Sequence, residues 1–346
     1  MSHDITVAGP DGSSPVLVAL GEGLLEVGVR ADLPPEYLGR GFGGDVANVA
    51  VMAARMGARA RLLTRLGADT PGRLLMDFWR RSGVDVGRVE VDPSAPTGVY
   101  VNAVRHGGHT FDYYRTGSAA TRLSPDDVDG RLLADAGVLH VSGISLAISG
   151  AAARAAERAA ELARERDVPV AFCVNHRPML RPDVGRVLAF ARASDIVIMS
   201  SEDARAVLGT DEPGRIRAAL GTGPRELVLT DGAAGAAVEA GGVLHRVAAP
   251  EVTVVDTAGA GDALAGAYLA GRLAGAEPPD ALEPAVIAAA LSCREPGCAR
   301  SYPSAEEVER VRAAVSSSAG TPAADRLGPP TRTPDRSPPR EEPRRL

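Results

Sequence analysis

Short apolar runs rich in β-branched residues alternate with longer segments rich in Ala, Arg and Leu through most of this chain. The apolar runs predict buried strands, at residues 16–20, 60–66, 137–143, 168–174, 195–199, 226–230 and 235–240. The longer segments predict helices at 48–57, at 151–167 and directly after Asp262. This alternation indicates a doubly wound α/β fold, in which helices cover both faces of a mostly parallel sheet and ligands bind at the carboxyl ends of the strands.

Two segments depart from this alternation, residues 28–43 and 97–117. Neither has the periodicity of a helix. The second alternates residue types on both sides of Gly107 and Gly108, which is typical of a β-hairpin. We therefore expect non-helical, β-rich structure in these segments.

The two ends of the chain differ in composition from the part between them. Residues 1–15 are polar and rich in Gly and Pro, which predicts a flexible extension. Residues 316–346 are dense in Pro and charge and have no aliphatic periodicity. They cannot bury enough apolar surface to fold, so they predict a disordered tail. The functional domain is expected within residues 16–315.

Composition narrows the classes of function. The chain has 346 residues, 45% of them hydrophobic, enough for one large α/β core or two modest domains. All 38 basic residues are Arg, and the absence of Lys excludes Walker-type P-loops, protein kinases and Schiff-base enzymes in their usual form. A net charge of −6 without a clustered basic face argues against nucleic acid as a partner.

Cysteine usage and hydropathy indicate a cytoplasmic protein that has no membrane partner. Cys173, Cys293 and Cys298 are scattered and odd in number, which is typical of reduced thiols. Cys293 and Cys298 are close enough in sequence to raise metal binding, but no His or further Cys completes a zinc set. No run approaches the roughly 18 apolar residues that a membrane span needs, and the N-terminus lacks the pattern of a signal peptide.

The motif DTAGAGD at residues 256–262 carries the chemistry. It lies between an apolar run and a small-residue segment, an order that predicts strand, glycine turn and helix. Gly259 and Gly261 allow backbone angles that turn the amides around Ala260 inward, at the positive end of the helix, where a phosphate is favoured. Asp262 can then reach a hydroxyl held against that phosphate, which is the geometry of phosphoryl transfer to an alcohol.

Two other interpretations use the same residues. A dinucleotide fingerprint, and with it an NAD-dependent enzyme, needs Gly or Ala where this chain has Leu264. A purely structural turn is the second alternative, since Gly-rich connections from strand to helix are common in α/β proteins.

The motif DTAGAGD and the helix after it resemble the C-terminal signature of the ribokinase-like (PfkB) family of carbohydrate kinases. The stretch 43–75 resembles the family's other signature, with Gly43, Gly44 and Asn48 in the matching places. Four further stretches are most similar to the branch that phosphorylates 2-keto-3-deoxygluconate: TGVY (97–100), FDYYRTGSAATRLSPDD (111–127), LHVSGISLAIS (139–149) and NHRP (175–178). The resemblance covers roughly residues 16–312.

This resemblance implies a three-layer α/β/α ribokinase-like fold over residues 16–315, in which the segments 28–43 and 97–117 form a small β-sheet lid over the sugar. A lid suits the chemistry, because water must be kept from the transferring phosphoryl group. The resemblance also implies ATP and Mg²⁺ as cofactors. The implied catalytic residues are Asp262, Gly259, Ala260 and Gly261.

The implied substrate-binding residues are Gly43, Gly44, Asn48, Tyr100, Tyr113, Arg115, Arg177 and Asp262. Residue chemistry favours an acidic sugar here, because the planar forks of Arg115 and Arg177 bind a carboxylate bidentately. Structural alternatives stay open: surface ion pairs for the two arginines, a helix cap for Asn48, and a tight turn for the two glycines.

At the nucleotide end, residues 227–238 resemble the family's strand-turn-strand. The implied cofactor-binding residues are Thr230, Gly232, Gly235, Gly259 and Gly261. Where the family usually carries Asn-x-x-Glu, this chain has Ser200-Ser201-Glu202-Asp203, so Asp203 and Glu202 are the expected carboxylates near the metal. The stretch EPGCARSYP (295–303) is a second departure, close to the expected substrate site.

The sequence thus predicts an ATP-dependent sugar kinase, with 2-keto-3-deoxygluconate as the expected substrate and Asp262 as the base. The helix N-terminus should favour the ionised form of Asp262 and make it a weak base. The alternatives are a fructokinase, ribokinase or nucleoside kinase, and a catalytically weak sugar- or nucleotide-binding protein. Expected partners are a small sugar and ATP, and an exposed edge of the lid sheet is a candidate homodimer contact.

Overall fold

The computed structural model describes residues 14–29, 38–105 and 108–319. The predicted N-terminal extension lies almost entirely outside the described residues, and so does the predicted tail from residue 320 onward. Helix α10 (Ala305–Ala319) continues four residues past the predicted domain boundary at 315. Its Val308 and Val311 pack on the core and anchor the helix. Among the described residues, no helix has the length and apolarity that crossing a membrane requires.

A nine-stranded sheet forms the centre of the molecule, in the order β13-β12-β11-β10-β9-β8-β1-β4-β5. Neighbouring strands run parallel from β11 to β5, and β12 and β13 pair antiparallel at the other edge. The strands are β1 (Val16–Leu20), β4 (Arg59–Gly67), β5 (Val84–Asp92), β8 (Ala136–Ser142), β9 (Val170–Cys173), β10 (Ile196–Ser200), β11 (Glu226–Thr230), β12 (Ala236–Ala240) and β13 (Val243–Val247).

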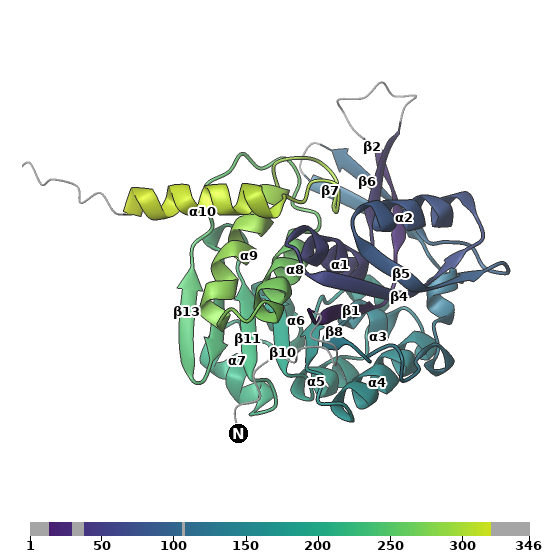
Figure 1. Cartoon of the computed structure of the whole chain (residues 1–346), viewed down its shortest axis with the longest axis horizontal. Helices are drawn as coiled ribbons and strands as arrows, with labels where there is room; N and C mark the ends of the chain where they lie inside the picture. Colours follow the sequence, from purple (N-terminus) through teal and green to yellow (C-terminus); the bar gives the residue numbers. More distant parts are fainter. Residues whose placement is uncertain (1–13, 30–37, 106–107, 320–346) are drawn as a thin grey trace, which may run out of the picture.

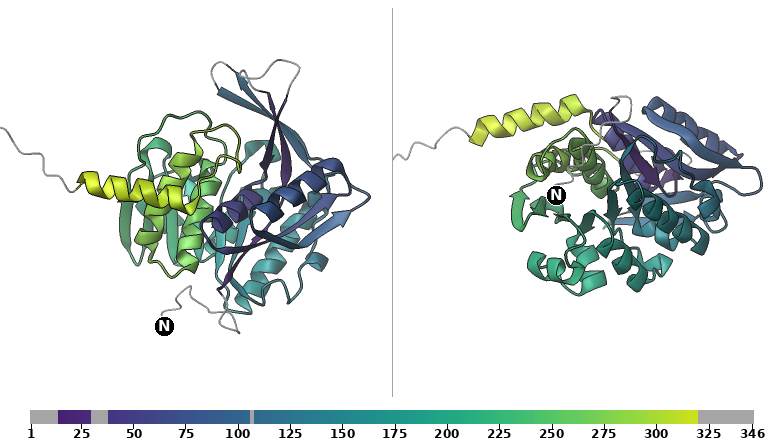
Figure 2. Two further views of the ribbon diagram at one scale, coloured as in Figure 1. Left: turned by 45° about the horizontal axis from the view of Figure 1, so that its top comes forward. Right: turned by 60° about the horizontal axis from the view of Figure 1, so that its bottom comes forward.

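Helices cover both faces of this sheet (Figures 1 and 2). One face packs against α1 (Asp45–Arg55), α2 (Thr70–Arg81), α8 (Ala260–Leu273) and α9 (Pro278–Ser292), with α10 on α9. The other packs against α3 (Gly143–Ala147), α4 (Gly150–Arg164), α5 (Val184–Arg192), α6 (Ser201–Leu208) and α7 (Pro213–Leu220). Short 3-10 turns lie at Ala119–Arg122, Pro125–Asp127, Pro178–Leu180 and Gly232–Ala234.

The central strand β1 shows why both faces are covered. Its five residues are all apolar and buried. Successive side chains of a strand point to opposite faces, and here Leu17 and Ala19 join the core under α1 and α8, whereas Val16, Val18 and Leu20 join the core under α4. A strand that is apolar throughout needs a helical layer on each side, which confirms the predicted three-layer fold.

A separate four-stranded sheet has the order β3-β2-β6-β7. Its strands are β2 (Leu24–Val29), β3 (Gly39–Gly43), β6 (Val99–Arg105) and β7 (Gly108–Tyr114). They project from the body of the protein above α2 (Figure 1; Figure 2, left). This sheet is the lid that the family resemblance implied. Strands β3, β6 and β7 lie within the predicted segments 28–43 and 97–117, β2 begins earlier at Leu24, and residues 30–37 and 106–107 lie outside the described residues.

All seven predicted strands are present, but β5 and β13 were missed. Both lie at edges of the main sheet, and both carry many exposed charged or polar side chains. An edge strand has neighbours on one side only, so it lacks the apolar signature of the central strands.

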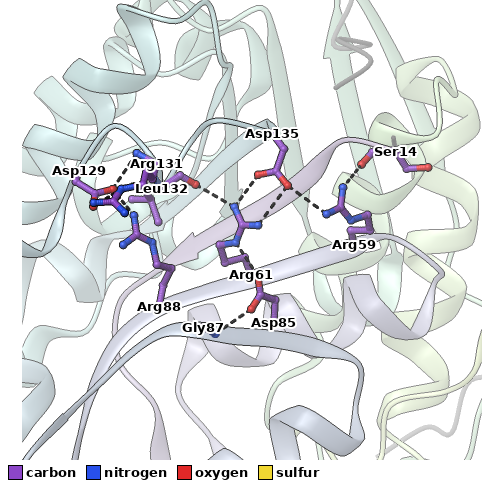
Figure 3. Close-up of polar contacts among 10 residues, drawn as sticks. All are labelled: Ser14, Arg59, Arg61, Asp85, Gly87, Arg88, Asp129, Arg131, Leu132 and Asp135. Atoms are coloured by element: carbon purple, nitrogen blue, oxygen red, sulfur yellow. Dashed lines mark hydrogen bonds and ion pairs between the residues drawn. The ribbon is translucent and has the colours of Figure 1, made fainter. Parts of the chain in front are cut away.

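Arginines and carboxylates form a network at the amino ends of β4, β5 and β8 (Figure 3). Arg61 is its hub. The Arg61 guanidinium donates to Asp85 Oδ2 at 2.8 Å and to both carboxylate oxygens of Asp135, at 2.7 and 3.2 Å. Arg59 donates to the same Asp135 at 3.2 Å and to the Ser14 carbonyl at 2.9 Å. Hydrogen bonds and charge from Arg61 hold the pKa of Asp135 below its ordinary value. Burial would raise the pKa of Asp85, but Arg61 and the Gly87 amide together outweigh it and lower that pKa.

We expect Arg61→Met to lower the free energy of unfolding by about 2 kcal/mol at pH 7, because it breaks two partly buried ion pairs. A depressed carboxylate pKa stabilises the fold above the unfolded value and loses that contribution as pH falls through the folded value. The cost should therefore shrink below about pH 4. Denaturant unfolding at pH 7 and pH 3 measures this loss in the free energy of unfolding.

Arg80→Met is the matched control, because Arg80 and Asp77 form an exposed pair 3.8 Å apart on α2. That variant should cost about 0.5 kcal/mol or less at either pH. Equal costs for the two variants at pH 7 would contradict the role of Arg61.

Candidate active site

A cleft of about 1470 Å³ lies at the carboxyl ends of the parallel strands, between the lid sheet and the N-terminus of α8. Of all the residues that the sequence predicted for the site, Gly43 alone does not line this cleft. An added Cβ at Gly43 would lie 2.7 Å from the Tyr100 ring and hydroxyl. Gly43 therefore makes room for Tyr100, and its predicted contact with substrate has no support in this geometry.

The glycine loop ends in the first turn of α8. Gly259 precedes the helix in the left-handed conformation, with φ +79°. The amide of Ala258 donates to Asp256 Oδ1 at 2.8 Å, and that of Ala260 donates to the Thr257 carbonyl at 3.2 Å. Among the described residues, the amides of Gly259, Gly261 and Asp262 have no acceptor. Three of the five amides at 258–262 thus remain for an anion.

Two hydrogen bonds connect this loop to residues outside the motif. The buried carboxylate of Asp256 also accepts the Gly297 amide at 2.9 Å. Tyr302 donates its hydroxyl to the Gly259 carbonyl at 2.8 Å. Both partners come from the stretch 295–303 that departs from the family pattern. That stretch therefore supports the glycine loop.

Asp262 lies at the cleft floor, beside α1. Asn48 Nδ2 donates to Asp262 Oδ2 at 2.8 Å. Burial and the negative charge of Asp45 raise the pKa of Asp262 to about 7, against the opposing effects of Asn48 and Arg177. The expectation of a weak, fully ionised base was wrong, because desolvation and a like charge outweigh the helix N-terminus. Asp262 is instead poised as a base near neutral pH.

The turn that carries Arg177 is tied down at two points. Asn175 has a left-handed φ of +38°, and its Nδ2 donates to Asp45 Oδ2 at 3.0 Å. The His176 amide donates to Asp203 Oδ1 at 2.8 Å. A non-glycine residue in this conformation persists only where its surroundings hold it. The turn is thus a fixed support for the exposed Arg177 side chain.

The two predicted arginines line the same cleft, but one is buried and the other is exposed. Arg115 is buried, forms an ion pair with Glu22, and lies with its guanidinium carbon 4.4 Å from the centre of the Tyr113 ring. Arg177 is exposed, and within the described part of the chain its only hydrogen bond is to the carbonyl of His176, at 3.0 Å. Both cations lower the pKa of Tyr113, although burial raises it overall.

Tyr100 offers a ring face to the cleft. Its hydroxyl donates to Glu26 Oε2 at 2.6 Å and lies 3.4 Å from Cys298 Sγ. The ring stacks on Tyr113 at 5.6 Å between centroids. Two stacked rings therefore form one wall of the cleft, and the Tyr100 hydroxyl is already hydrogen-bonded.

At the nucleotide end, Thr230, Gly232 and Gly235 line the cleft beside α6. Ser200 and Asp203 form a capping box at the start of α6. Both oxygens of Asp203 accept backbone amides, from His176 and from Ser200. Glu202 is exposed at the cleft rim, so it is the better placed of the two predicted metal carboxylates. The metal assignment stays a prediction.

Comparison with known proteins identifies the family. A family model described as "pfkB family carbohydrate kinase" matches residues 29–305. The chain belongs to the PfkB family of carbohydrate kinases. This confirms the resemblance that the two signatures carried.

Relatives of this PfkB kinase differ in substrate. It is 38% identical over 316 residues to 2-dehydro-3-deoxygluconokinase of Thermoproteus tenax, covering 86% of this chain and 94% of that protein. It is 30% identical to fructokinase-1 of Oryza sativa subsp. japonica, covering 75% and 83%. In fold it matches a crystal structure of a putative ribokinase II from E. coli in complex with ATP and Mg²⁺, with a TM-score of 0.79, 24% identity and coverage of 87% and 100%.

Sequence reasoning missed several residues of this PfkB site, namely Glu22, Asp45, Asn175, Asp256 and Tyr302. Asp45 and Asp256 lie inside the two signatures, so their position was a signal. Asn175 and Tyr302 lie in stretches that the sequence had already marked, 175–178 and 295–303. Glu22 had no signal, because its partner Arg115 is distant in sequence. Cys173, Cys293 and Cys298 are all free thiols, and all three line the cleft.

Proposed function

We propose that this PfkB kinase transfers the γ-phosphate of ATP to a hydroxyl of an acidic sugar, 2-keto-3-deoxygluconate, which the names of several relatives give as 2-dehydro-3-deoxygluconate. One observation carries the proposal: the Asp262 carboxylate lies beside helix-terminal amides that have no acceptor in the described structure, in a cleft that also holds Arg115 and Arg177. The 38% identity to the Thermoproteus tenax enzyme supports the choice of sugar.

In this mechanism Asp262 acts on the acceptor hydroxyl. Asn48 holds Asp262 Oδ2, and Oδ1 has no donor among the described residues, so Oδ1 takes the hydroxyl proton. The hydroxyl oxygen forms its bond to the γ-phosphorus while the bond from that phosphorus to the leaving oxygen of ADP breaks. Because the transition state is loose, holding the hydroxyl in line matters more than removing its proton early.

The remaining groups stabilise charge. The free amides of Gly259, Gly261 and Asp262 face the transferring phosphoryl group, and Arg177 supplies a cation without its own ion pair in the described structure. Glu202 fits an outer role toward Mg²⁺, as an exposed carboxylate that lines the cleft. When bound, Mg²⁺ would neutralise charge on the ATP phosphates.

The test of the proposed function is ADP release with Mg·ATP, comparing 2-keto-3-deoxygluconate with fructose, ribose and adenosine. Preference for the acidic sugar is the expected result. Turnover of neutral acceptors alone would keep a kinase and remove the acidic substrate. Nucleotide binding without turnover of any of the four would instead favour a catalytically weak homologue.

We also expect kcat/KM to fall at acid pH. A base with a pKa of about 7 must be deprotonated to act, so kcat/KM should fall about tenfold per pH unit below 7. The measurement is the pH profile of kcat/KM for the best of the four substrates, at saturating Mg·ATP. A limb near pH 4 would show that Asp262 keeps an ordinary carboxylate pKa.

A further inference from the structure

Arg115, which is expected to bind the substrate carboxylate, already pairs with a carboxylate of the protein. Arg115 Nη1 bonds Glu22 Oε1, and the two side chains are only 8% and 1% exposed. Both residues line the cleft. A second carboxylate arriving at Arg115 would place two negative charges against one positive charge in a desolvated site, which is costly. Arg177 also lines the cleft, but it is exposed and therefore screened by solvent, so binding of an acidic sugar at Arg115 favours a compensating change of charge among the buried groups.

Glu22 has an atom suited to supply that compensation. Its other oxygen, Oε2, is buried and has no hydrogen-bond partner in the described structure. The ionised and polar groups around Glu22 are Arg115 and Tyr113 at the lid and Asp45 at the start of α1. Burial raises the pKa of Glu22 to about 7, with Asp45 adding to the rise and Arg115 opposing it. Glu22 can thus change charge near neutral pH.

We propose that Glu22 takes up one proton on Oε2 when the carboxylate of an acidic sugar binds Arg115, which makes Glu22 the residue that sets the charge specificity of the cleft. This inference rests on the proposed function. The proton comes from solvent and returns to it when the product leaves, and no covalent bond of the substrate changes. The guanidinium has donors on two edges, so it can hold neutral Glu22 and a carboxylate together.

Because binding and proton uptake are coupled, acidic and neutral sugars should differ in how their Kd depends on pH. With a pKa of about 7, Glu22 is largely ionised at pH 8. An acidic sugar should then bind with uptake of about 0.9 proton, and its Kd should rise about tenfold per pH unit above 7. A neutral sugar brings no charge, so its binding should take up no proton and should not show this pH dependence.

Isothermal titration calorimetry of the full chain at pH 8, in two buffers of different ionisation enthalpy, counts the protons. The probe is 2-keto-3-deoxygluconate without nucleotide. We expect Glu22→Gln to remove the uptake and to flatten the rise of Kd between pH 7 and 9, since Gln keeps the shape and an acceptor for Arg115. Asp262→Asn is the matched control, and it should retain the uptake, because Asp262 is the other carboxylate at the cleft whose pKa is about 7.

The outcomes separate the two proposals. Binding of the acid without proton uptake by the wild type would overturn the role of Glu22 and leave the kinase assignment intact. Uptake that persists in Glu22→Gln and vanishes in Asp262→Asn would assign the proton to Asp262 and likewise overturn it. Failure of the acid to bind, with binding or turnover of a neutral sugar, would overturn the acidic substrate and this inference together. If Glu22→Gln does not fold, the wild-type proton count and the Asp262→Asn count still decide.

Discussion

Replacing Asp262 with Asn should lower kcat at least about a hundredfold, the usual scale for a positioned acid-base group. Asn keeps the size of the side chain and can still pair with Asn48, so the cleft should keep its shape. Removing a carboxylate whose pKa is raised by burial also removes a destabilising ionised form, so Tm at pH 8 should stay level or rise. The measurements are kcat, nucleotide Kd and Tm.

Asp280→Asn is the matched control for this substitution. Asp280 is likewise an acidic residue in the first turn of a helix, α9, but it is exposed and lies outside the cleft lining. It should leave kcat within about twofold of wild type, since surface changes away from the site are small in effect. Near-wild-type kcat in Asp262→Asn would remove Asp262 from the mechanism.

Replacing Gly44 with Ala should damage folding and sugar binding together. Gly44 has φ +96°, and an added Cβ would lie 2.4 Å from the Glu22 carbonyl oxygen and 2.7 Å from Gly23 Cα. Neither backbone atom can move aside cheaply. We expect a loss of about 3 kcal/mol or more in the free energy of unfolding. We also expect at least about a tenfold loss in kcat/KM, because displacing the start of α1 misplaces Asn48.

Gly57→Ala separates strain from displacement. Gly57 follows the same helix with φ +89°, and among the described residues no heavy atom lies within 4 Å of its added Cβ. This variant should show only the conformational cost, about 1 to 2 kcal/mol, with unchanged kcat/KM. Denaturant unfolding and steady-state kinetics compare the pair. Equal kinetic losses in the two variants would contradict a specific role for Gly44 at the site.

The sequence predicted well those parts of the protein that depend on patterns of neighbouring residues. The buried strands, the lid hairpin and the glycine loop each follow from residues that are neighbours in the chain. Asn48 and Asp262 could be placed in one site because each belongs to a signature. Their direct hydrogen bond, across 214 residues, emerged only from the way α1 packs beside α8.

The parts that sequence could not predict depend on contacts between distant segments. Glu22 and Arg115 are 93 residues apart, and Asp45 and Asn175 are 130 apart. The sequence left a surface ion pair open for Arg115 but gave no sign that its partner would be the buried carboxylate of Glu22. The pKa of Asp262 was mispredicted for the same reason, since the helix N-terminus is local whereas burial and Asp45 belong to the assembled cleft.

The network around Arg61 lies at the amino ends of β4, β5 and β8, whereas the cleft lies at the carboxyl ends of the parallel strands and includes Ile144, just after β8. At about 3.3 Å per residue, the seven residues of β8 separate the network from the cleft by roughly 20 Å. Substitutions so far apart, with no shared partners, usually have additive effects. In a directed-evolution experiment, the amino ends of these strands are therefore where thermostability and acid tolerance can be selected independently of turnover and substrate choice.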